Sequence, residues 1–263
     1  MITETRNELI DKIIKTYELQ TPDIADAVEL YYDSQKLRIM HQNKERTEAP
    51  NQLTEWFYKW LMLGEHVITA KLKQWVESDR SPVEAKWAYN QIGIGPIIAA
   101  GLAAHIDPVK AESPSAVWRF AGLAPGFDRR TKGEKLPYNS RLKVLCWKLS
   151  ESFVKVSGKD DAVYGQLYVQ FKTDEVSRNE NGLYAKQAAQ ELALKKFKEN
   201  ATKKRLQEGK LSDAHLHARA KRRATKIFLG HYYVVARQAR GLPVRGPYVQ
   251  QILNHDGIIE PIQ

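Results

Sequence analysis

The sequence predicts an all-α protein, a multi-helix domain with a central helix-hairpin-helix and a long basic C-terminal helical region. Three observations support this fold class. Apolar residues recur every three or four positions through most of the chain. Many of these segments open with Ser, Thr, Asp or Asn close to a proline, which is typical of a helix start. Runs that alternate between apolar and polar residues, the pattern of strands, are nearly absent.

The composition indicates a folded globular protein. Of its 263 residues 43% are hydrophobic, and six are Trp. Cys146 is the single cysteine, which excludes a disulfide framework and a cysteine-based zinc site. The N-terminal sequence lacks the layout of a signal peptide, and no stretch approaches about 18 uninterrupted apolar residues. We therefore expect a cytoplasmic protein that has no membrane partner.

We expect three regions, of which the first is residues 1–80. Apolar spacing predicts three helices there, at residues 3–18, 22–41 and 53–77. The third of these helices is dense in large side chains. We expect its aromatic residues, among them Trp56 and Trp60, to lie in the core and not on a base-stacking surface.

The second region, residues 81–155, contains the helix-hairpin-helix. Ser81-Pro82-Val83-Glu84 is typical of a helix start with Ser81 as its cap. The hairpin follows at Gly93-Ile94-Gly95, where glycine permits positive φ or a close approach of a ligand to the backbone. Pro96 suits the first position of the next helix. The amides of Gly93, Ile94 and Gly95 beside that helix N-terminus suit a phosphate.

The rest of this region continues with helix signals around a basic loop. Ser113 caps a short helix that Gly122 ends, and Asn139-Ser140 caps a helix that runs to about residue 156. The loop between them, residues 124–139, contains several Gly and Pro residues, and a β-ribbon is an alternative structure for this segment.

The third region, residues 156–263, is expected to be helical and basic. A tyrosine-rich helix at 164–172 is followed by a polar turn, a basic helix at 183–208 and a last helix at 212–241. Residues 129–245 contain 27 Lys and Arg against 11 Asp and Glu, whereas the rest of the chain contains 14 against 20. This local excess of positive charge favours an extended polyanion, and so a nucleic acid, as the partner. The expected phosphate-binding side chains are Arg129, Arg130, Lys132, Lys135, Arg141, Lys203, Lys204, Arg205, Arg219, Arg222, Arg223 and Lys226.

Several segments of the chain resemble a known family. They are QIGIGPIIAAGLAAHID, SAVWRFAGLAP, the basic loop and NSRLKVLCW. In this order they resemble the helical C-terminal domain of Piv-type DNA invertases and of the related bridge-RNA-guided insertion-sequence transposases. AGLAP at 121–125 is similar to the family's "aGLxP" turn, and Arg141 and Leu142 occupy its basic helix start. The closing ARAKRRATKIFL is similar to the final basic helix of short phage and plasmid relatives.

The resemblance implies DNA binding in a mobile-element or phage setting of recombination or transposition. Two departures bear on activity. Full-length members carry an N-terminal RuvC-like domain with metal-binding acidic residues, whereas residues 1–80 are expected to be helical here. The family also supplies a nucleophilic serine in the basic loop, and GFDRRTKGEK has none. An active transposase or recombinase would therefore use Thr131 or Ser140, and an RNA-binding or structural module is a third alternative.

No cofactor or metal site is expected. The glycine-rich hairpin follows no predicted strand, as a nucleotide-cofactor fingerprint would require. His215 and His217 point about 200° apart on a helix, so one ion could not readily bind both. The expected partner is DNA, which could be branched, while RNA and a second copy of the chain remain open.

Overall fold

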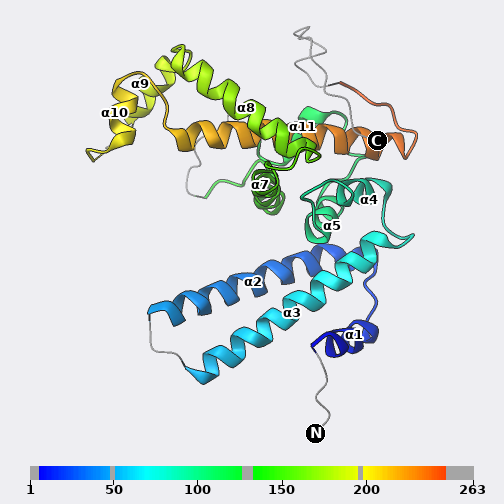
Figure 1. Ribbon diagram of the computed structural model, residues 1–263. Helices are drawn as coiled ribbons and strands as arrows, with labels where there is room; N and C mark the ends of the chain where they lie inside the picture. The colour runs from blue at the N-terminus through cyan, green and yellow to red at the C-terminus, as the bar shows by residue number, and fades with distance from the viewer. Residues whose placement is uncertain (1–5, 48–50, 126–132, 195–197, 247–263) are drawn as a thin grey trace. The chain divides into compact units, whose positions relative to one another are not determined.

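The computed structural model describes residues 6–47, 51–125, 133–194 and 198–246, and every regular element within these ranges is a helix (Figure 1). The all-α prediction is confirmed. The described residues form two compact units that alternate along the chain. The first unit comprises the described residues up to 90, with 94–111 and 235–242; the second comprises 91–93, 112–234 and the described residues after 242. The expected boundaries at 80/81 and 155/156 each fall inside one unit, and the three-region division stays a prediction.

The first unit contains the N-terminal helices and the two helices that flank the hairpin. Its elements are α1 (Arg6–Thr16), the 3-10 turn η1 (Thr21–Asp23), α2 (Ile24–Thr47), α3 (Gln52–Glu77), α4 (Val83–Tyr89) and α5 (Pro96–His105). The long helices α2 and α3 lie side by side, and α5 packs against both (Figure 1). Small residues on α5, among them Ala99 and Ala100, are fully buried, because a short side chain lets helices approach closely.

Only some of the aromatic side chains of α3 are buried as expected. Trp75 is buried near the end of α3, but Trp56 is 61% exposed and Trp60 is 58% exposed. The cause is geometric: in a two-helix pair, only one face of α3 can contact α2. The expectation that Trp56 and Trp60 lie in the core is therefore wrong.

Two arginines near the end of α11 (Asp213–Gln238) bind other residues of the first unit. Arg237 is buried and donates to the carbonyl oxygens of Pro108 and Ala111, both at 2.8 Å. Arg240 donates two hydrogen bonds, at 2.8 and 2.9 Å, to the buried carboxylate of Glu84. Both arginines therefore have a structural role.

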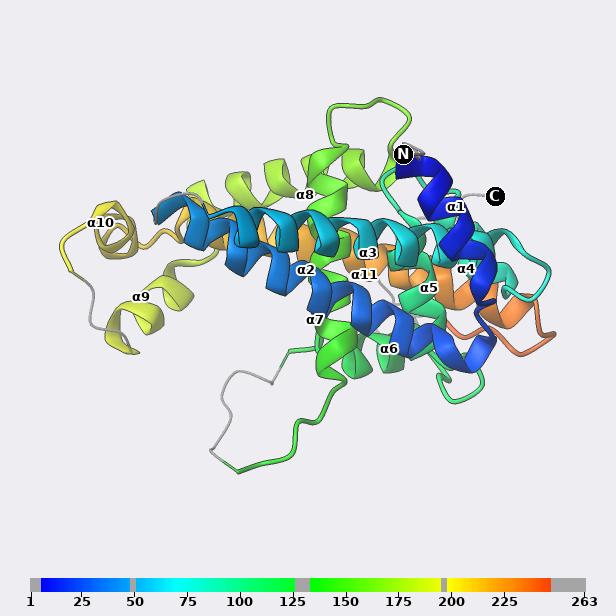
Figure 2. The ribbon, with the colours of Figure 1, turned by 90° about the horizontal axis from the view of Figure 1, so that it is seen from below.

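The second unit contains the remaining helices. They are α6 (Pro114–Phe120), α7 (Ser140–Lys155), α8 (Val163–Glu180), α9 (Ala185–Leu194), α10 (Ala201–Gln207) and most of α11 (Asp213–Gln238). Figure 2 shows α7 running across α11. The core at this crossing is aromatic: the ring of Phe153 lies 5.2 Å from that of Tyr164 and 5.6 Å from that of Phe228. His231 is buried there and shares a 2.8 Å hydrogen bond with Tyr164, so its side chain belongs to this core.

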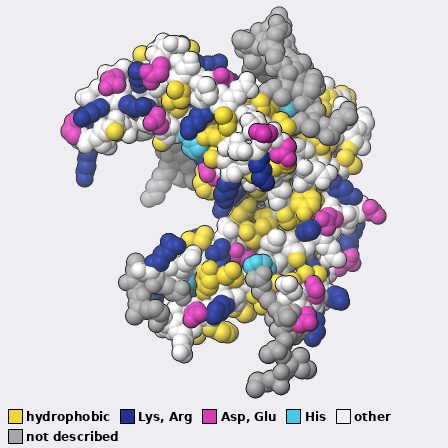
Figure 3. Space-filling model, in the orientation of Figure 1, with side chains coloured by type: hydrophobic (Ala, Val, Ile, Leu, Met, Phe, Trp, Pro, Cys, Tyr) yellow, Lys and Arg dark blue, Asp and Glu magenta, His cyan; other side chains and the backbone are white. Residues whose placement is uncertain are grey.

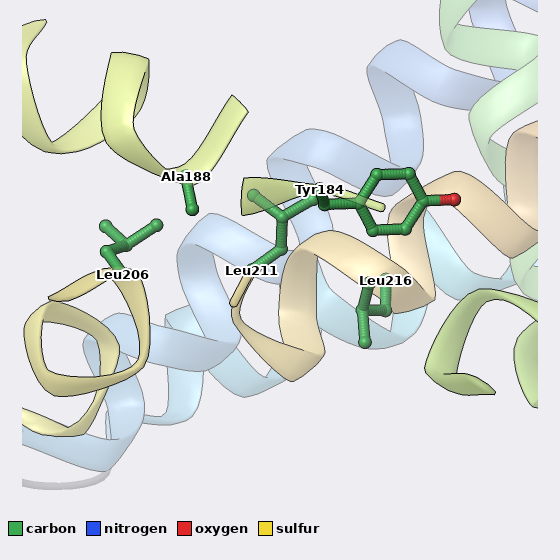
Figure 4. Close-up of a cluster of buried hydrophobic side chains, with 5 residues drawn as sticks. All are labelled: Tyr184, Ala188, Leu206, Leu211 and Leu216. Carbon is green, nitrogen blue, oxygen red and sulfur yellow. The ribbon is translucent and has the colours of Figure 1, made fainter. Parts of the chain in front are cut away.

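The single basic helix expected at 183–208 is wrong, because two helices, α9 and α10, occupy this segment. Asn200 begins α10 by accepting a hydrogen bond from the backbone amide of Lys203 at 2.9 Å. The two helices and the start of α11 enclose a small apolar cluster (Figure 4). Its members are Tyr184, Ala188, Leu206, Leu211 and Leu216. Burying Ala188 and Leu206 against each other requires the chain to turn back between them.

The caps expected from the sequence are confirmed at three of four sites. Ser113 caps α6 and Asn139 caps α7, each accepting from a backbone amide three residues later. Gly122 ends α6 with φ +67°, a conformation that favours glycine. Ser81 does not cap α4, because Pro82 occupies the cap position and the buried Ser81 hydroxyl has no hydrogen-bond partner among the described residues. The described part of 124–139 contains no strand.

Candidate nucleic-acid interface

The hairpin between α4 and α5 is built as its sequence predicts. Asn90 ends α4, and Pro96 occupies the first position of α5. The carbonyl of Gly95 accepts hydrogen bonds from the amides of Ile98 and Ala99, both at 3.1 Å. The turn between the two helices therefore leads directly into the N-terminus of α5, where the helix dipole favours negative charge.

Gly93 is required by the fold. Its φ of +95° lies in the region that side chains rarely adopt. A Cβ atom there would lie 3.0 Å from Cγ2 of Val156, closer than nearly all real contacts. The carbonyl of Gly93 also accepts a hydrogen bond from the Ser152 hydroxyl. Gly93 thus packs against the end of α7, within the second unit.

Gly95 differs, because the fold does not require glycine at this position. Its φ of −88° and ψ of 169° are extended values that any residue adopts. A Cβ atom built on Gly95 would meet no atom within 4 Å. The space beside this backbone is open, as an approaching phosphate group would need.

The backbone amides of this turn are available to a ligand to different degrees. Those of Gly93, Ile94, Gly95 and Ile97 donate no hydrogen bond within the described part of the chain. Ile94 is only 5% exposed because its side chain is part of the core, so a ligand has little access to its backbone amide. Ile97 was missed from the sequence: as the first α5 residue with an N–H after Pro96, it belongs to the orphan donors of a helix start. Gly95 and Ile97 are the better pair of donors.

Two of the expected phosphate-binding arginines are already paired. Arg219 donates from Nε to Glu175 at 2.6 Å and stacks over the ring of Tyr184 at 4.4 Å. Arg223 pairs with the same carboxylate at 3.2 Å and lies 4.1 Å from the ring centre of Phe171. Glu175 is 1% exposed, and this carboxylate could not be buried without such partners. Both arginines therefore join α11 to α8.

The pKa of Glu175 reports this network. Burial raises the pKa, but the hydrogen bonds from Tyr184 and Arg219 and the charges of Arg219 and Arg223 outweigh it. The net result is a pKa below the ordinary value for Glu, so the carboxylate is ionised at neutral pH.

Two of the other expected cations on α10 and α11 are more accessible. Arg222 and Lys204 are exposed, and neither has an ion-pair partner in the described ranges. Lys203 pairs with Glu199, and Arg205 pairs with Asp213. Lys226 lies 5.3 Å from the ring centre of Trp118, and burial, then the charge of Arg222, lowers its pKa. Figure 3 shows Lys and Arg interleaved with acidic side chains around α9 and α10, so the surface there is not uniformly cationic.

Several expected residues lie in or beside the basic loop. Lys135 and Arg141 are exposed, the latter on the first turn of α7. Ser140 is exposed at the start of the same helix, and its hydroxyl has no hydrogen-bonded base among the described residues. Arg129, Arg130, Thr131 and Lys132 lie outside the described residues.

The two histidines considered for a metal site have separate protein partners. His217 shares a 2.8 Å hydrogen bond with Tyr168, whereas His215 lies 3.0 Å from Glu191 and 3.3 Å from Gln187. Within the described ranges, no group of three or more His, Cys, Asp or Glu side chains is placed to bind a metal ion. Nor does any helix in those ranges combine the length and apolar character that crossing a membrane requires.

Comparison of the chain with protein-family models, with curated proteins and with solved structures found no match.

Proposed function

We propose that this protein binds the phosphate backbone of DNA through the hairpin between α4 and α5. The observation that carries the proposal is the open backbone at Gly95. The fold does not need glycine at position 95. Because Gly95 has no Cβ atom, however, a phosphate group can approach the backbone closely beside the free amides of Gly95 and Ile97.

The charge of the chain supports the same partner. A net charge of +10, with the excess concentrated in residues 129–245, attracts a polyanion over a long range. Arg222 and Lys204 are available for such contacts, since no described carboxylate pairs with them. The contacts are to phosphate and not to base edges, so binding depends weakly on sequence and strongly on salt.

The resemblance of residues 91–145 to the helical domain of Piv-type invertases and bridge-RNA-guided transposases suggests a setting. We infer a DNA-binding role in mobile-element or phage recombination. The proposal concerns binding alone, and strand transfer by Thr131 or Ser140 remains a separate alternative.

A salt titration tests this proposal. The logarithm of the association constant for duplex DNA should fall linearly with the logarithm of salt concentration, by about 0.9 per phosphate contacted. Lys204→Gln should make this slope shallower by about one. Lys59→Gln is the matched control, because Lys59 lies on α3 in the first unit and pairs with Glu55. The salt dependence of DNA binding by this variant should have the same slope as that of the wild type. A slope near zero for the wild type would contradict the proposal.

A further inference from the structure

Trp147 is a large apolar side chain that the helical packing leaves outside the core. It lies on α7, is 55% exposed, and follows the 54% exposed Val144 by one turn. The buried face of α7 uses other residues, among them Leu145 and Leu149. The indole of Trp147 therefore has no packing role that accounts for its size.

Two ammonium groups lie near this indole. The ammonium of Lys148 lies 5.7 Å from the ring centre of Trp147, and that of Lys221, from α11, lies 5.9 Å from it. Lys221 also pairs with Glu151, the single acidic residue of α7, which carries four basic ones. Burial and then the charge of Lys155 lower the pKa of Lys148, so a further cation lies close by.

Ammonium groups from α7 and α11 thus lie near one exposed aromatic ring, within the second unit. An exposed indole between ammonium groups is the arrangement with which proteins bind single-stranded nucleic acid, because the ring stacks on a base and the cations follow the backbone.

The other exposed tryptophans lack this setting. Trp56 and Trp60 are as exposed as Trp147, but they lie on α3 in the part of the chain where acidic residues outnumber basic ones. Trp118 is half-buried, and its Nε1 donates a 2.9 Å hydrogen bond to the carbonyl of Lys226, which gives it a structural role. Charge complementarity therefore selects Trp147.

We propose that Trp147 stacks on an unpaired base of a single-stranded DNA segment, while Lys148 contacts an adjacent phosphate. This inference rests on the proposed DNA-binding function and adds a second mode of contact to it. The hairpin contacts the phosphate backbone of any DNA, whereas Trp147 requires an unpaired base. The full chain would then prefer DNA with a single-stranded portion, such as a branch or flap, over uninterrupted duplex.

Binding of a short oligothymidylate and of a duplex by the full chain tests this inference. Trp147→Leu, which keeps apolar bulk but removes the ring, should weaken binding of the single strand by about tenfold, the loss of one stacked base, and change duplex binding by less than about twofold. Trp147→Tyr should restore most of the affinity because it restores a stacking ring. Trp60→Leu is the control, since it removes an equally exposed indole, and it should bind both DNAs as the wild type does.

A spectroscopic readout accompanies the affinities. Stacking on a base quenches indole fluorescence, so the quenching that the single strand produces should shrink in Trp147→Tyr although binding persists. Unchanged thermal unfolding of the three variants, expected for exposed side chains, shows that they are folded. Wild-type affinity of Trp147→Leu for the single strand, or an equal loss in Trp60→Leu, would overturn the inference while leaving the proposed function intact. Failure of the wild type to bind either DNA would overturn both.

Discussion

At the scale of single residues, the buried carboxylate of Glu175 determines which arginines of α11 remain available to a ligand. Glu175 attracts Arg219 and Arg223 from α11 and accepts a 2.6 Å hydrogen bond from the Tyr184 hydroxyl. Two arginines that the sequence places on a basic helix are thereby used to join helices. Arg222, between them in sequence, remains exposed.

Replacing this carboxylate should reduce stability in a pH-dependent way. Glu175→Gln leaves Arg219 and Arg223 without a counter-charge, and we expect the free energy of unfolding at pH 7 to fall by about 2 kcal/mol. The value is below that for a fully buried pair because both arginines are about one-third exposed. The folded pKa of Glu175 is lowered, so its stabilising effect is present above the unfolded pKa near 4.3 and is lost as pH falls through the folded value.

Urea unfolding at several pH values measures this effect. The difference in unfolding free energy between the wild type and Glu175→Gln should be largest at neutral pH and should shrink below about pH 4. Glu180→Gln is the control, since its pair with Lys210 is exposed and should contribute less than about 1 kcal/mol. A difference that stays constant from neutral to acid pH would contradict this assignment.

At the scale of elements, the hairpin contains two glycines with different roles. Gly93 needs its positive φ and the space against Val156, so Gly93→Ala should lower the free energy of unfolding by about 1–3 kcal/mol. Gly95→Ala meets no atom and keeps an ordinary φ, so the change should be below about 1 kcal/mol. Chemical denaturation of the two variants checks this order, and equal losses would show that Gly95 also serves the fold.

Local signals explain which elements the sequence could predict. The Ser113 and Asn139 caps, the left-handed Gly122 and the Pro96 helix start each act within one turn, so they are visible in a short stretch of sequence. The turn between α9 and α10 was missed because it depends on Ala188 and Leu206 meeting in a tertiary cluster. Propensity alone favours continuing the helix through such a basic segment.

The candidate site was predictable to a similar extent. The hairpin glycines follow from local sequence, but the availability of a cation depends on carboxylates far along the chain. Glu175 lies 44 residues before Arg219, a separation at which no sequence spacing predicts a pair. Trp147 was missed because a tryptophan on an amphipathic helix is expected in the core, and only the packing of α7 shows its exposure.

At the scale of the whole molecule, charge is unevenly distributed along a chain that folds into two units. The basic excess in residues 129–245 falls mostly in the second unit, while the hairpin lies where the chain passes from α4 to α5. General electrostatic attraction and a specific phosphate contact can therefore be altered separately by mutation. A change at Gly95 affects the specific contact without altering the basic segment.

The most direct test of the account is duplex binding by two variants of one position. Asp and Asn cap a helix equally well, so Gly95→Asp and Gly95→Asn should both leave α5 intact and the protein as stable as the wild type. They differ by one negative charge placed where the phosphate is proposed to lie. We predict that Gly95→Asp binds duplex DNA at least about tenfold more weakly than Gly95→Asn, a cost of about 1.4 kcal/mol. If both folded variants bind duplex DNA as tightly as the wild type, the claim that the hairpin binds phosphate is contradicted, because either side chain fills the open space at Gly95.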